Sequence, residues 1–244
     1  MKSTALRKQA VTAQTDFEAN GFAVIEVTKL PDDVLASFDR MPRDTHSLSR
    51  LREIRLSQYF GYWEEGKWFF ALLPKRKYIQ SAEYIRLAEA GGVSRYREQL
   101  EIDPSPLISC VLDNLPVDRS SSFQINVNQI RVVANPEFKG VTVPEGPHRD
   151  GHRYSVIAVA YRHNVDGGET QVIDPVTNEI VFRTILNENQ AILIDDERYI
   201  HYATNIVPAQ GSVGHRDIWV IEVNPWENRA YGPKHESLAS GAMK

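Results

Sequence analysis

Two histidines and one aspartate stand at a spacing that could hold a metal ion. His148 and Asp150 flank a single residue in the segment Pro-Glu-Gly-Pro-His-Arg-Asp-Gly-His, and His201 follows on a later segment of β character. Side chains two residues apart on a strand project from the same face, so the first pair could supply two ligands with Cα atoms about 6–7 Å apart. Two imidazoles and one carboxylate leave positions on a non-haem iron(II) ion open for oxygen and small molecules. The pattern therefore indicates an oxidising enzyme.

A basic residue lies where such a site would need one. Arg216 stands fifteen positions after His201, at the start of the β-like run 217–223. An arginine there could hold a dicarboxylate cosubstrate through two parallel hydrogen bonds. A His-x-Asp pair alone occurs by chance in surface turns, and a lone arginine at a strand end is commonly exposed. The combination of these residues favours the metal site.

Substrate contacts are less sharply marked in the sequence. Glu145 precedes the metal pair and could bind a substrate ammonium, or it could serve only in a turn. The run 124–131 carries polar residues on both faces, so Gln129 or Arg131 could face a wet cavity. The alternative for that run is an edge strand that faces solvent.

Other polar residues are better explained without a direct role. His152 lies four residues after His148, a spacing that would bring both side chains together on a helix, but Gly151 argues against a helix there. A supporting or surface position of His152 is therefore favoured over ligation. The carboxylates 195–197 follow an apolar strand and are expected in a solvated turn. His215 is expected to be exposed on the face opposite to the arginine, and His163 is expected to be solvated in a turn.

The order of the expected elements predicts a mainly β protein with flanking helices, an α+β fold. Helices are expected over residues 5–20, 31–41 and 81–100, the last broken at Gly91-Gly92. After residue 120, short β-rich runs cover residues 123–133, 154–161, 169–173, 180–186, 191–194, 201–207 and 217–223. A further short strand around His148 would make eight, which is typical of a double-stranded β-helix, the jelly-roll core of cupins.

The whole chain, residues 1–244, is expected to form a single domain. A mixed helical and strand part over residues 1–120 would flank the jelly-roll core over 121–226, and residues 227–244 would form a loosely packed tail. The segment 42–75 matches no motif and could shape substrate choice.

Composition weighs against several classes of partner. The formal net charge of -4 gives no reason to expect nucleic acid or an anionic membrane. A single cysteine, Cys110, excludes an internal disulfide and a cysteine-rich zinc site. No apolar run approaches the roughly 20 residues of a membrane span, and the first residues lack the apolar core of a secretory signal. These features predict a cytoplasmic protein.

Together these residues resemble the Fe(II)- and 2-oxoglutarate-dependent dioxygenases. Within that superfamily the chain is similar to bacterial free amino acid hydroxylases of the isoleucine dioxygenase type, through motifs at residues 78–81, 91–96, 144–151 and 162–169. The resemblance implies that His148, Asp150 and His201 hold Fe(II). It also implies that Arg216 pairs with the distal carboxylate of 2-oxoglutarate and that O2 is a further cosubstrate. Related halogenases lack a carboxylate at the position of Asp150, so the resemblance implies hydroxylation.

The leading hypothesis is hydroxylation of an unactivated C–H bond of a small molecule, most simply a free L-amino acid. One alternative is hydroxylation of a peptide or protein side chain or of another small metabolite. A non-enzymatic alternative is a cupin-like binding protein with a vestigial metal site, which would not bind 2-oxoglutarate. A homo-oligomer is compatible with each of these hypotheses.

Overall fold

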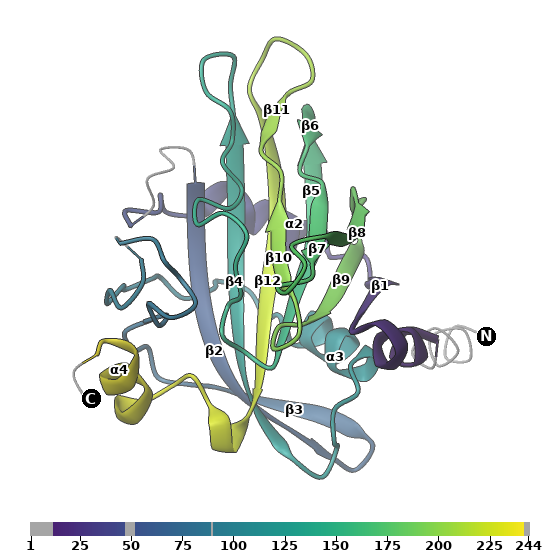
Figure 1. The fold of residues 1–244 in the computed structure, drawn as a ribbon, viewed down its shortest axis with the longest axis vertical. Coiled ribbons are helices and arrows are strands. Elements are labelled where there is room, and N and C mark those ends of the chain that lie inside the picture. The colour runs from purple at the N-terminus through teal and green to yellow at the C-terminus, as the bar shows by residue number, and fades with distance from the viewer. Residues whose placement is uncertain (1–11, 47–51, 89, 242–244) are drawn as a thin grey trace.

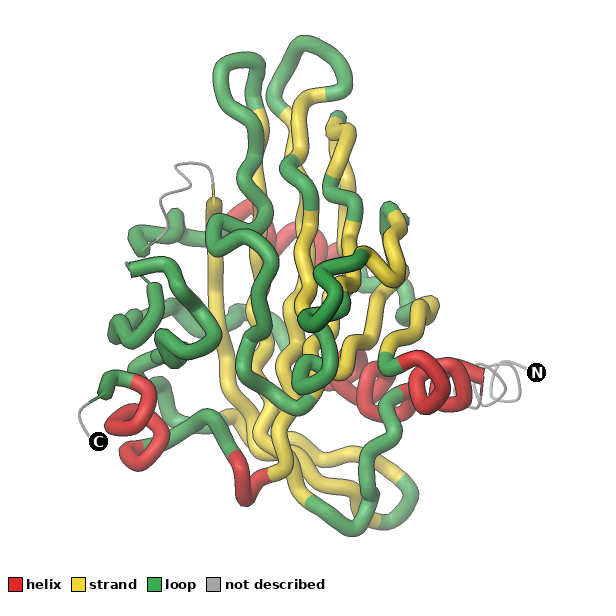
Figure 2. The backbone as a smooth tube through the Cα atoms, in the orientation of Figure 1, coloured by secondary structure: helices red, strands yellow, loops and turns green. Residues whose placement is uncertain are grey.

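The computed structural model describes residues 12–46, 52–88 and 90–241, and Figures 1 and 2 show the path of the chain. Residues 12–20 form a helix that ends at Gly21, whose φ of +80° turns the chain into the first strand. Glycine adopts such a left-handed φ without a steric cost, which is why it commonly ends helices. The expected helix over residues 5–20 is thus confirmed where it is described, and its first part lies outside the described residues.

A large antiparallel sheet forms the body of the molecule (Figure 1). Its strand order is β1-β9-β5-β12-β4-β2-β3. The bounds are β1 Phe22–Glu26, β2 Arg52–Glu64, β3 Lys67–Leu72, β4 Ser122–Ala134, β5 Tyr154–His163, β9 Gln190–Asp195 and β12 Gly214–Pro225. Strands β2 and β3 come from the segment for which the sequence offers no motif, and β2 pairs along most of its length with β4. The N-terminal part of the chain therefore extends the same sheet that the jelly-roll strands build.

Smaller sheets lie in front of the large one in Figure 1. One contains β10 (Ile200–Ala203), β7 (Thr170–Ile173) and β8 (Ile180–Thr184), and the other pairs β11 (Ile206–Pro208) with β6 (Val165–Gly167). Isolated bridges from Gly140 to Ile206 and from His148 to His201 bring the segment 140–148 alongside β11 and β10. The strands on either side of the central space make the double-stranded β-helix that the sequence predicts. The strand expected around His148 is reduced to a single bridge.

Helices cover one face of the large sheet. Residues Ile125 and Val127 of β4 face the main hydrophobic core, which also contains Leu112 of α3 (Ser105–Asn114). The helix over residues 12–20 contributes Phe17 to this core, and the 3-10 helix η1 (Ser37–Arg40), which continues α2 (Asp32–Ala36), contributes Phe38. Each fully buried side chain of this kind stabilises the fold by about 1.5–3 kcal/mol. The expected helix over residues 31–41 is thus realised as α2 and η1.

The opposite face of the large sheet looks toward the small sheets. A second apolar cluster fills part of the space between them and includes Ile130, Val132, Ile192 and Val172. Because side chains alternate along a strand, even-numbered residues of β4 point to this side and odd-numbered residues point to the helices. The remaining space between the sheets holds polar side chains and the cavity described below.

The predicted helix over residues 81–100 is wrong. This segment forms turns, and Tyr78 pairs with Arg95 in an isolated bridge. A Cβ atom at Gly91 would lie 2.0 Å from the carbonyl oxygen of Ile85, so the chain folds back on itself where only glycine fits. The two glycines therefore shape a loop rather than interrupt a helix.

Three helices, one of them a 3-10 helix, appear where the sequence analysis placed none. Helix α3 begins directly after Pro104 and buries an apolar stripe against the sheet. The tail contains the 3-10 helix η2 (Trp226–Asn228) and α4 (Pro233–Ala239), and Arg76 Nε lies 2.6 Å from Glu236 Oε1 of α4. The described part of the tail is therefore tied to the body of the protein.

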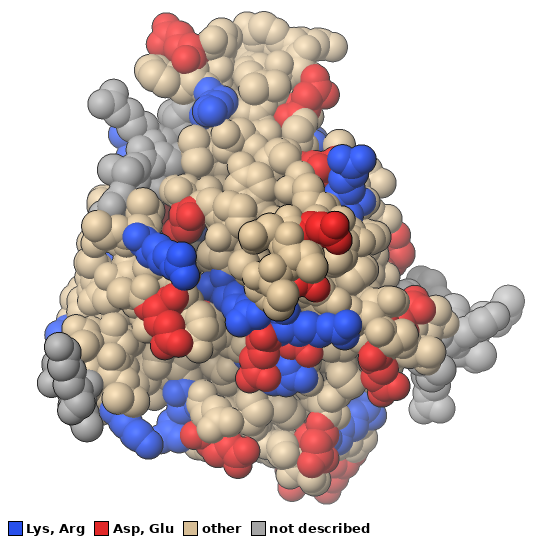
Figure 3. Space-filling model, in the orientation of Figure 1, with Lys and Arg blue, Asp and Glu red and all other residues tan. Residues whose placement is uncertain are grey.

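The surface shows no region of one dominant charge on the face drawn in Figure 3, where basic and acidic side chains are interspersed. Within the described part of the chain, every helix is too short or too polar to cross a lipid bilayer.

Candidate active site

The three expected metal ligands meet at one end of the space between the sheets. His148 and His201 pair through their backbones, with N–H to O distances of 3.1 Å and 2.9 Å. Asp150 lies in the loop that leads into β5, and one ligand atom from each of the three residues lies within 4.8 Å of the others. His148 Nε2 is 3.2 Å from Asp150 Oδ1, and His201 Nε2 is 3.4 Å from Asp150 Oδ2. The predicted ligands therefore converge on one point.

Polar contacts at the Nδ1 atoms orient both imidazole rings for metal binding. His148 Nδ1 lies 2.9 Å from the carbonyl oxygen of Gly146, which can only accept, so Nδ1 carries the proton. His201 Nδ1 lies 3.4 Å from Asp196 Oδ1, an electrostatic contact without the geometry of a hydrogen bond. When a ring is neutral with its proton on Nδ1, as metal binding requires, the lone pair lies on Nε2, the nitrogen that faces Asp150 in both residues. Metal-binding histidines use this arrangement in proteins generally.

Asp196 supports the metal-binding loop from behind. Its carboxylate accepts backbone N–H groups from Asp150 at 3.1 Å, Gly151 at 2.8 Å and His152 at 3.1 Å. Its side chain is fully buried. The expectation that the carboxylates 195–197 occupy a solvated turn is therefore wrong for this residue. Asp196 holds the turn that places Asp150 in front of the two rings.

The electrostatics of the cluster favour a positive charge between its ligand atoms. Burial opposes ionisation of Asp150, but His201 and His148 outweigh it and hold the pKa of Asp150 well below its usual range. Burial would also lower the pKa of His201, but Asp150 and Asp196 raise it to about 10. A site that stabilises an added proton in this way also suits a divalent cation. Two imidazole nitrogens and one carboxylate fit Fe(II) by donor type.

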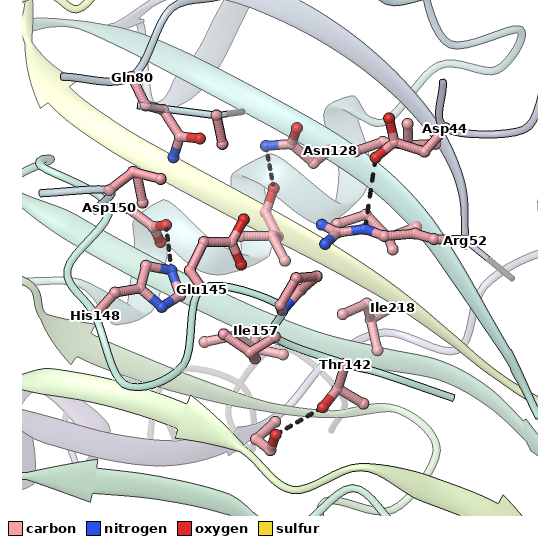
Figure 4. A pocket seen from close by; sticks show the side chains of 18 of the residues that line it. Asp44, Arg52, Gln80, Asn128, Thr142, Glu145, His148, Asp150, Ile157 and Ile218 are labelled. Atoms are coloured by element: carbon pink, nitrogen blue, oxygen red, sulfur yellow. Dashed lines mark hydrogen bonds and ion pairs between the residues drawn. The ribbon is translucent and has the colours of Figure 1, made fainter. Parts of the chain in front are cut away.

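The cluster opens into a cavity of about 990 Å³, counting its solvent-filled mouth. Alternate residues of β2, β4 and β12 line its floor, and the strand register sets them side by side in rows. In order along the strands, the lining residues of these rows are Arg52 and Arg216; Ile54, Ile130 and Ile218; Asn128 and Val220; and Glu222. The floor thus changes from cationic, through apolar, to polar along the strands. Figure 4 shows His148 and Asp150 on one side of the cavity and Arg52 with Asp44 on the other.

Arg216 lies in this cavity with unused hydrogen-bond donors. Its side chain is 1% exposed, and its Nε and Nη2 atoms have no partner. Burial and the neighbouring cation of Arg162 lower the pKa of Arg216 to about 9. Thr170 also lines the cavity, and its buried Oγ1 has no partner. Among the described residues no carboxylate pairs with Arg216, so its unused donors are available to an anion.

An arginine–carboxylate pair on the opposite face of the sheet, between β4 and β12, shows how such an edge is used. Arg131 Nε and Nη2 lie 2.7 Å and 2.8 Å from the two carboxylate oxygens of Asp217. The same two nitrogens, on one edge of the guanidinium, are free in Arg216. Such an edge binds a carboxylate through two parallel hydrogen bonds.

A buried polar network lies next to the metal ligands. Glu222 accepts hydrogen bonds from Asn126 Nδ2 at 2.6 Å and from the Tyr78 hydroxyl at 3.3 Å. His152 Nε2 lies 3.0 Å from the same carboxylate, which raises the pKa of His152 against the opposing effect of burial. Ser155 donates to Asp150, the carboxylate ligand. His152 therefore has the supporting position that the sequence favours over ligation.

The structure places the other sequence-predicted residues as follows. Glu145 lines the cavity near His148, as Figure 4 shows. Gln129 and Arg131 do not line it: Gln129 donates to Ser37 Oγ at 2.7 Å, and Arg131 pairs with Asp217. The prediction that they face the site is therefore corrected, because β4 is a central strand and its odd-numbered residues point toward the helices. The even-numbered neighbour Asn128 lines the cavity instead.

His163, His215 and Arg149 lie away from the cavity. His163 is exposed, as expected, and His215 is half-buried on the face opposite to Arg216, less exposed than predicted. Arg149 donates through Nη2 to the carbonyl oxygen of Arg198 at 3.3 Å. None of these side chains lines the cavity.

Several lining residues have no role in the sequence-based prediction. They come from the segments 44–54 and 78–97 and include Asp44, Arg52, Arg95 and Arg97. Arg97 Nη1 pairs with Asp44 Oδ1 at 2.9 Å. Tyr78 and Arg95 stand within motifs that support the family resemblance, which is the signal that could have pointed to them.

Comparisons with known proteins agree with this geometry. No curated protein sequence matches the chain. Among solved structures, it is similar to a bsmA homologue from Methylobium petroleophilum PM1, with 23% identity, a TM-score of 0.75, and coverage of 89% of this chain and 93% of that chain. It is also similar to IDO from Bacillus thuringiensis, with 16% identity, a TM-score of 0.67, and coverage of 91% and 96%. These likenesses show a shared fold.

A third solved structure is the Fe(II)/α-ketoglutarate-dependent dioxygenase TqaL, with 13% identity, a TM-score of 0.62, and coverage of 91% of this chain and 88% of that chain. The model of the 2OG-Fe dioxygenase family matches residues 35–222, which is more than half of the sequence. That stretch contains the three candidate ligands, Arg216 and most of the residues that line the cavity. The chain belongs to the 2OG-Fe dioxygenase family, whose members use Fe(II), 2-oxoglutarate and O2.

Proposed function

We propose that this dioxygenase hydroxylates an unactivated C–H bond of a small molecule, and that the substrate is a free L-amino acid. In this proposal His148, Asp150 and His201 hold Fe(II), and Arg216 binds the distal carboxylate of 2-oxoglutarate. The observation that carries the proposal is that the ligand cluster and a buried arginine with unused donors line the same cavity.

The unpaired state of Arg216 is the strongest support for the cosubstrate site. A buried cation without a counter-ion is costly, so a protein keeps one where a ligand supplies the negative charge. The free edge formed by Nε and Nη2, together with the free hydroxyl of Thr170, suits a carboxylate. Between Arg216 and the ligand cluster the floor is apolar, with Ile218 and Val220 on β12. A molecule with anionic ends and methylene groups between them matches this succession of a cationic edge, an apolar floor and a metal-binding cluster.

The side chains around the site have distinct tasks in this proposal. With Fe(II) bound, the family's cofactor chemistry supplies the oxidising power for C–H hydroxylation. Asp196 and the carbonyl of Gly146 orient the ligand side chains. The apolar residues Ile130, Ile157 and Ile218 exclude water from the methylene part of the cosubstrate. Asp150 fills a ligand position with a carboxylate, which favours hydroxylation over halogenation.

The cavity favours a small zwitterion as the primary substrate. Loops from the segments 78–97 and 142–145 line it together with the sheet, so it is walled on several sides. Glu145 offers a carboxylate near His148 that could receive an ammonium group. A peptide substrate would need an open groove, and family membership favours catalysis over a vestigial metal-binding role.

The direct test measures succinate formed from 2-oxoglutarate with Fe(II), ascorbate and a panel of proteinogenic L-amino acids. We expect succinate formation to rise with at least one amino acid and a hydroxylated product to appear in the mass spectrum. His148→Ala should abolish turnover, whereas the exposed His163→Ala should retain it. Absence of turnover with the entire panel, with iron bound, would refute the amino acid proposal.

A thermal shift assay with Mn(II) in place of Fe(II) measures metal binding and cosubstrate binding separately. At 100 times the dissociation constant, a ligand adds about 2.7 kcal/mol of stability, which for a chain of this size raises Tm by roughly 5–11 °C. We expect such a rise from 2-oxoglutarate on the wild type. Arg216→Ala should keep the shift caused by Mn(II) and lose the shift caused by 2-oxoglutarate. An unchanged 2-oxoglutarate shift in that variant would contradict the role of Arg216.

A further inference from the structure

We propose that Arg95 binds the carboxylate of the primary substrate and so restricts the enzyme to substrates that carry an anionic group. This inference rests on the proposed function of the same cavity. It adds a specificity-determining residue to the metal ligands and Arg216.

Arg95 is a second buried cation of the cavity that lacks a counter-ion. It is 4% exposed and lines the cavity. Its Nη2 donates to Gln80 Oε1 at 2.7 Å, and its guanidinium carbon lies 5.0 Å from the centre of the Tyr78 ring. Its Nε has no partner. Among the described residues, no carboxylate forms an ion pair with this side chain.

Two other largely buried arginines of this protein are neutralised by carboxylates. Arg97 Nη1 lies 2.9 Å from Asp44 Oδ1, and Arg131 is paired with Asp217 at 2.7 Å. In the proposed function Arg216 receives the distal carboxylate of the cosubstrate. Arg95 then remains as a buried guanidinium for which the protein supplies only a neutral amide and an aromatic ring. A buried charge of this kind is stabilised when a ligand brings the opposite charge.

The contacts of Arg95 hold its guanidinium plane in place without using all of its donors. The backbones of Tyr78 and Arg95 are joined by two hydrogen bonds of 2.9 Å, which place the ring beneath the guanidinium. The amide oxygen of Gln80 fixes one end of the plane. Because the side chain is already ordered, a carboxylate would bind with little loss of side-chain entropy. The arrangement is therefore preorganised for an anion.

Apolar side chains of the same loop indicate what kind of group the rest of the substrate carries. Ile85, Leu87 and Ala90 line the cavity together with Arg95. They offer a surface for an aliphatic group but no hydrogen-bonding side chain. The substrate class that fits is an aliphatic carboxylate, and in the proposed function it is an amino acid whose carboxylate meets Arg95.

The test compares acids with their uncharged amides. The probes are L-leucine with L-leucinamide and matching pairs from the other aliphatic amino acids. Their binding is measured by calorimetry on protein loaded with Mn(II) and 2-oxoglutarate, and KM is measured by succinate release with Fe(II). Loss of one charge-assisted contact corresponds to about a 10- to 100-fold weakening. We expect the wild type to prefer at least one acid over its amide by that factor.

Arg95→Gln should weaken the acid by the same factor and bring acid and amide within about threefold of one another. Arg95→Lys should recover part of the preference, since it restores the charge without the planar fork. Arg86→Gln, an exposed arginine of the same loop, is the matched control and should behave as the wild type. The 2-oxoglutarate affinity of all three variants should be unchanged.

Two results would overturn the assignment. One is a preference for acid over amide that survives in Arg95→Gln, which would give Arg95 a structural role only. The other is a wild type that binds no acid of the panel or binds amides equally well, and this result needs no variant to fold. Binding of 2-oxoglutarate that depends on Arg216 would show in either case that the cosubstrate proposal stands.

Discussion

Asp196 gives the sharpest quantitative prediction, because one buried carboxylate serves three backbone donors of the metal-binding loop. We expect Asp196→Asn to weaken metal binding and destabilise the fold together. The replaced carboxylate accepts N–H groups from Asp150, Gly151 and His152 at 3.1, 2.8 and 3.1 Å. An asparagine keeps one acceptor oxygen, so at least one of these donors would face an NH2 group instead.

The magnitude follows from these contacts. A hydrogen bond to a charged group contributes about 1.5–3 kcal/mol, and an unpaired buried donor adds a desolvation cost of about 1–3 kcal/mol. Because such contributions are not additive, we expect a loss of roughly 2–4 kcal/mol in the free energy of unfolding. Loss of a partner behind a metal ligand typically costs about 10–100-fold in metal affinity. The longer contact of Asp196 with His201 Nδ1, 3.4 Å, places that ring under the same influence.

The assay combines urea unfolding of the metal-free protein with anaerobic titration of Mn(II) or Fe(II). Glu197→Gln is the matched control, since that neighbouring carboxylate is 68% exposed and lies 3.4 Å from Arg153. An exposed ion pair of this kind contributes about 0–1 kcal/mol. If Asp196→Asn bound metal within twofold of the wild type and lost no more stability than the control, the role assigned to Asp196 would be refuted.

Gly168→Ala should weaken 2-oxoglutarate binding several-fold, because the added Cβ would lie 3.1 Å from Arg216 Cδ at a φ of +71°. Gly66→Ala is the control, since Gly66 has a similar φ of +82° with open space around it, and this variant should leave binding unchanged. Both are measured by calorimetry on the Mn(II) protein. Burial opposes ionisation of Asp44, but Arg97, Arg52 and the backbone of His46 outweigh it and lower the pKa of Asp44 below 3.8. The ionised Asp44 therefore stabilises the fold above pH 3.8, and this stabilisation is lost as the pH falls through the lower folded-state pKa. Urea unfolding should therefore show Asp44→Asn to be less stable than the wild type at pH 7, with the difference shrinking at pH values below 3.8; a constant difference would contradict this account.

The strands of the jelly roll and the ligand cluster could be predicted from the sequence because their signals are local. The β-rich run of β4 and the apolar run of β5 mark these strands, and His148 and Asp150 carry the metal-ligand spacing two positions apart. Arg216 could be predicted for the same reason, since its distance along the chain from His201 is characteristic.

The face of a strand that points to the site could not be predicted in the same way. Gln129 and Asn128 are equally polar neighbours, and only the pairing of β4 with β12 and β2 decides that Asn128 lines the cavity. The role of Asp196 depends on a contact with backbone atoms far away in the sequence. Because any residue type offers such a backbone N–H group, the sequence could not identify this partner. The loop over residues 81–100 has helical periodicity, but the close approach of Gly91 to Ile85 overrides it.

The backbone bridge between His148 and His201 has a consequence for how the protein acquires its metal. These residues are far apart along the chain, yet their amides and carbonyls are mutually bonded in the fold itself. The chain entropy of joining such distant segments is lost when the barrel forms, and the arriving ion does not have to organise them. Capture of the metal then involves only the exchange of its hydration water and a proton for side-chain donors already in position. We therefore expect the site to fill after folding is complete, with no part for the ion in reaching the native topology.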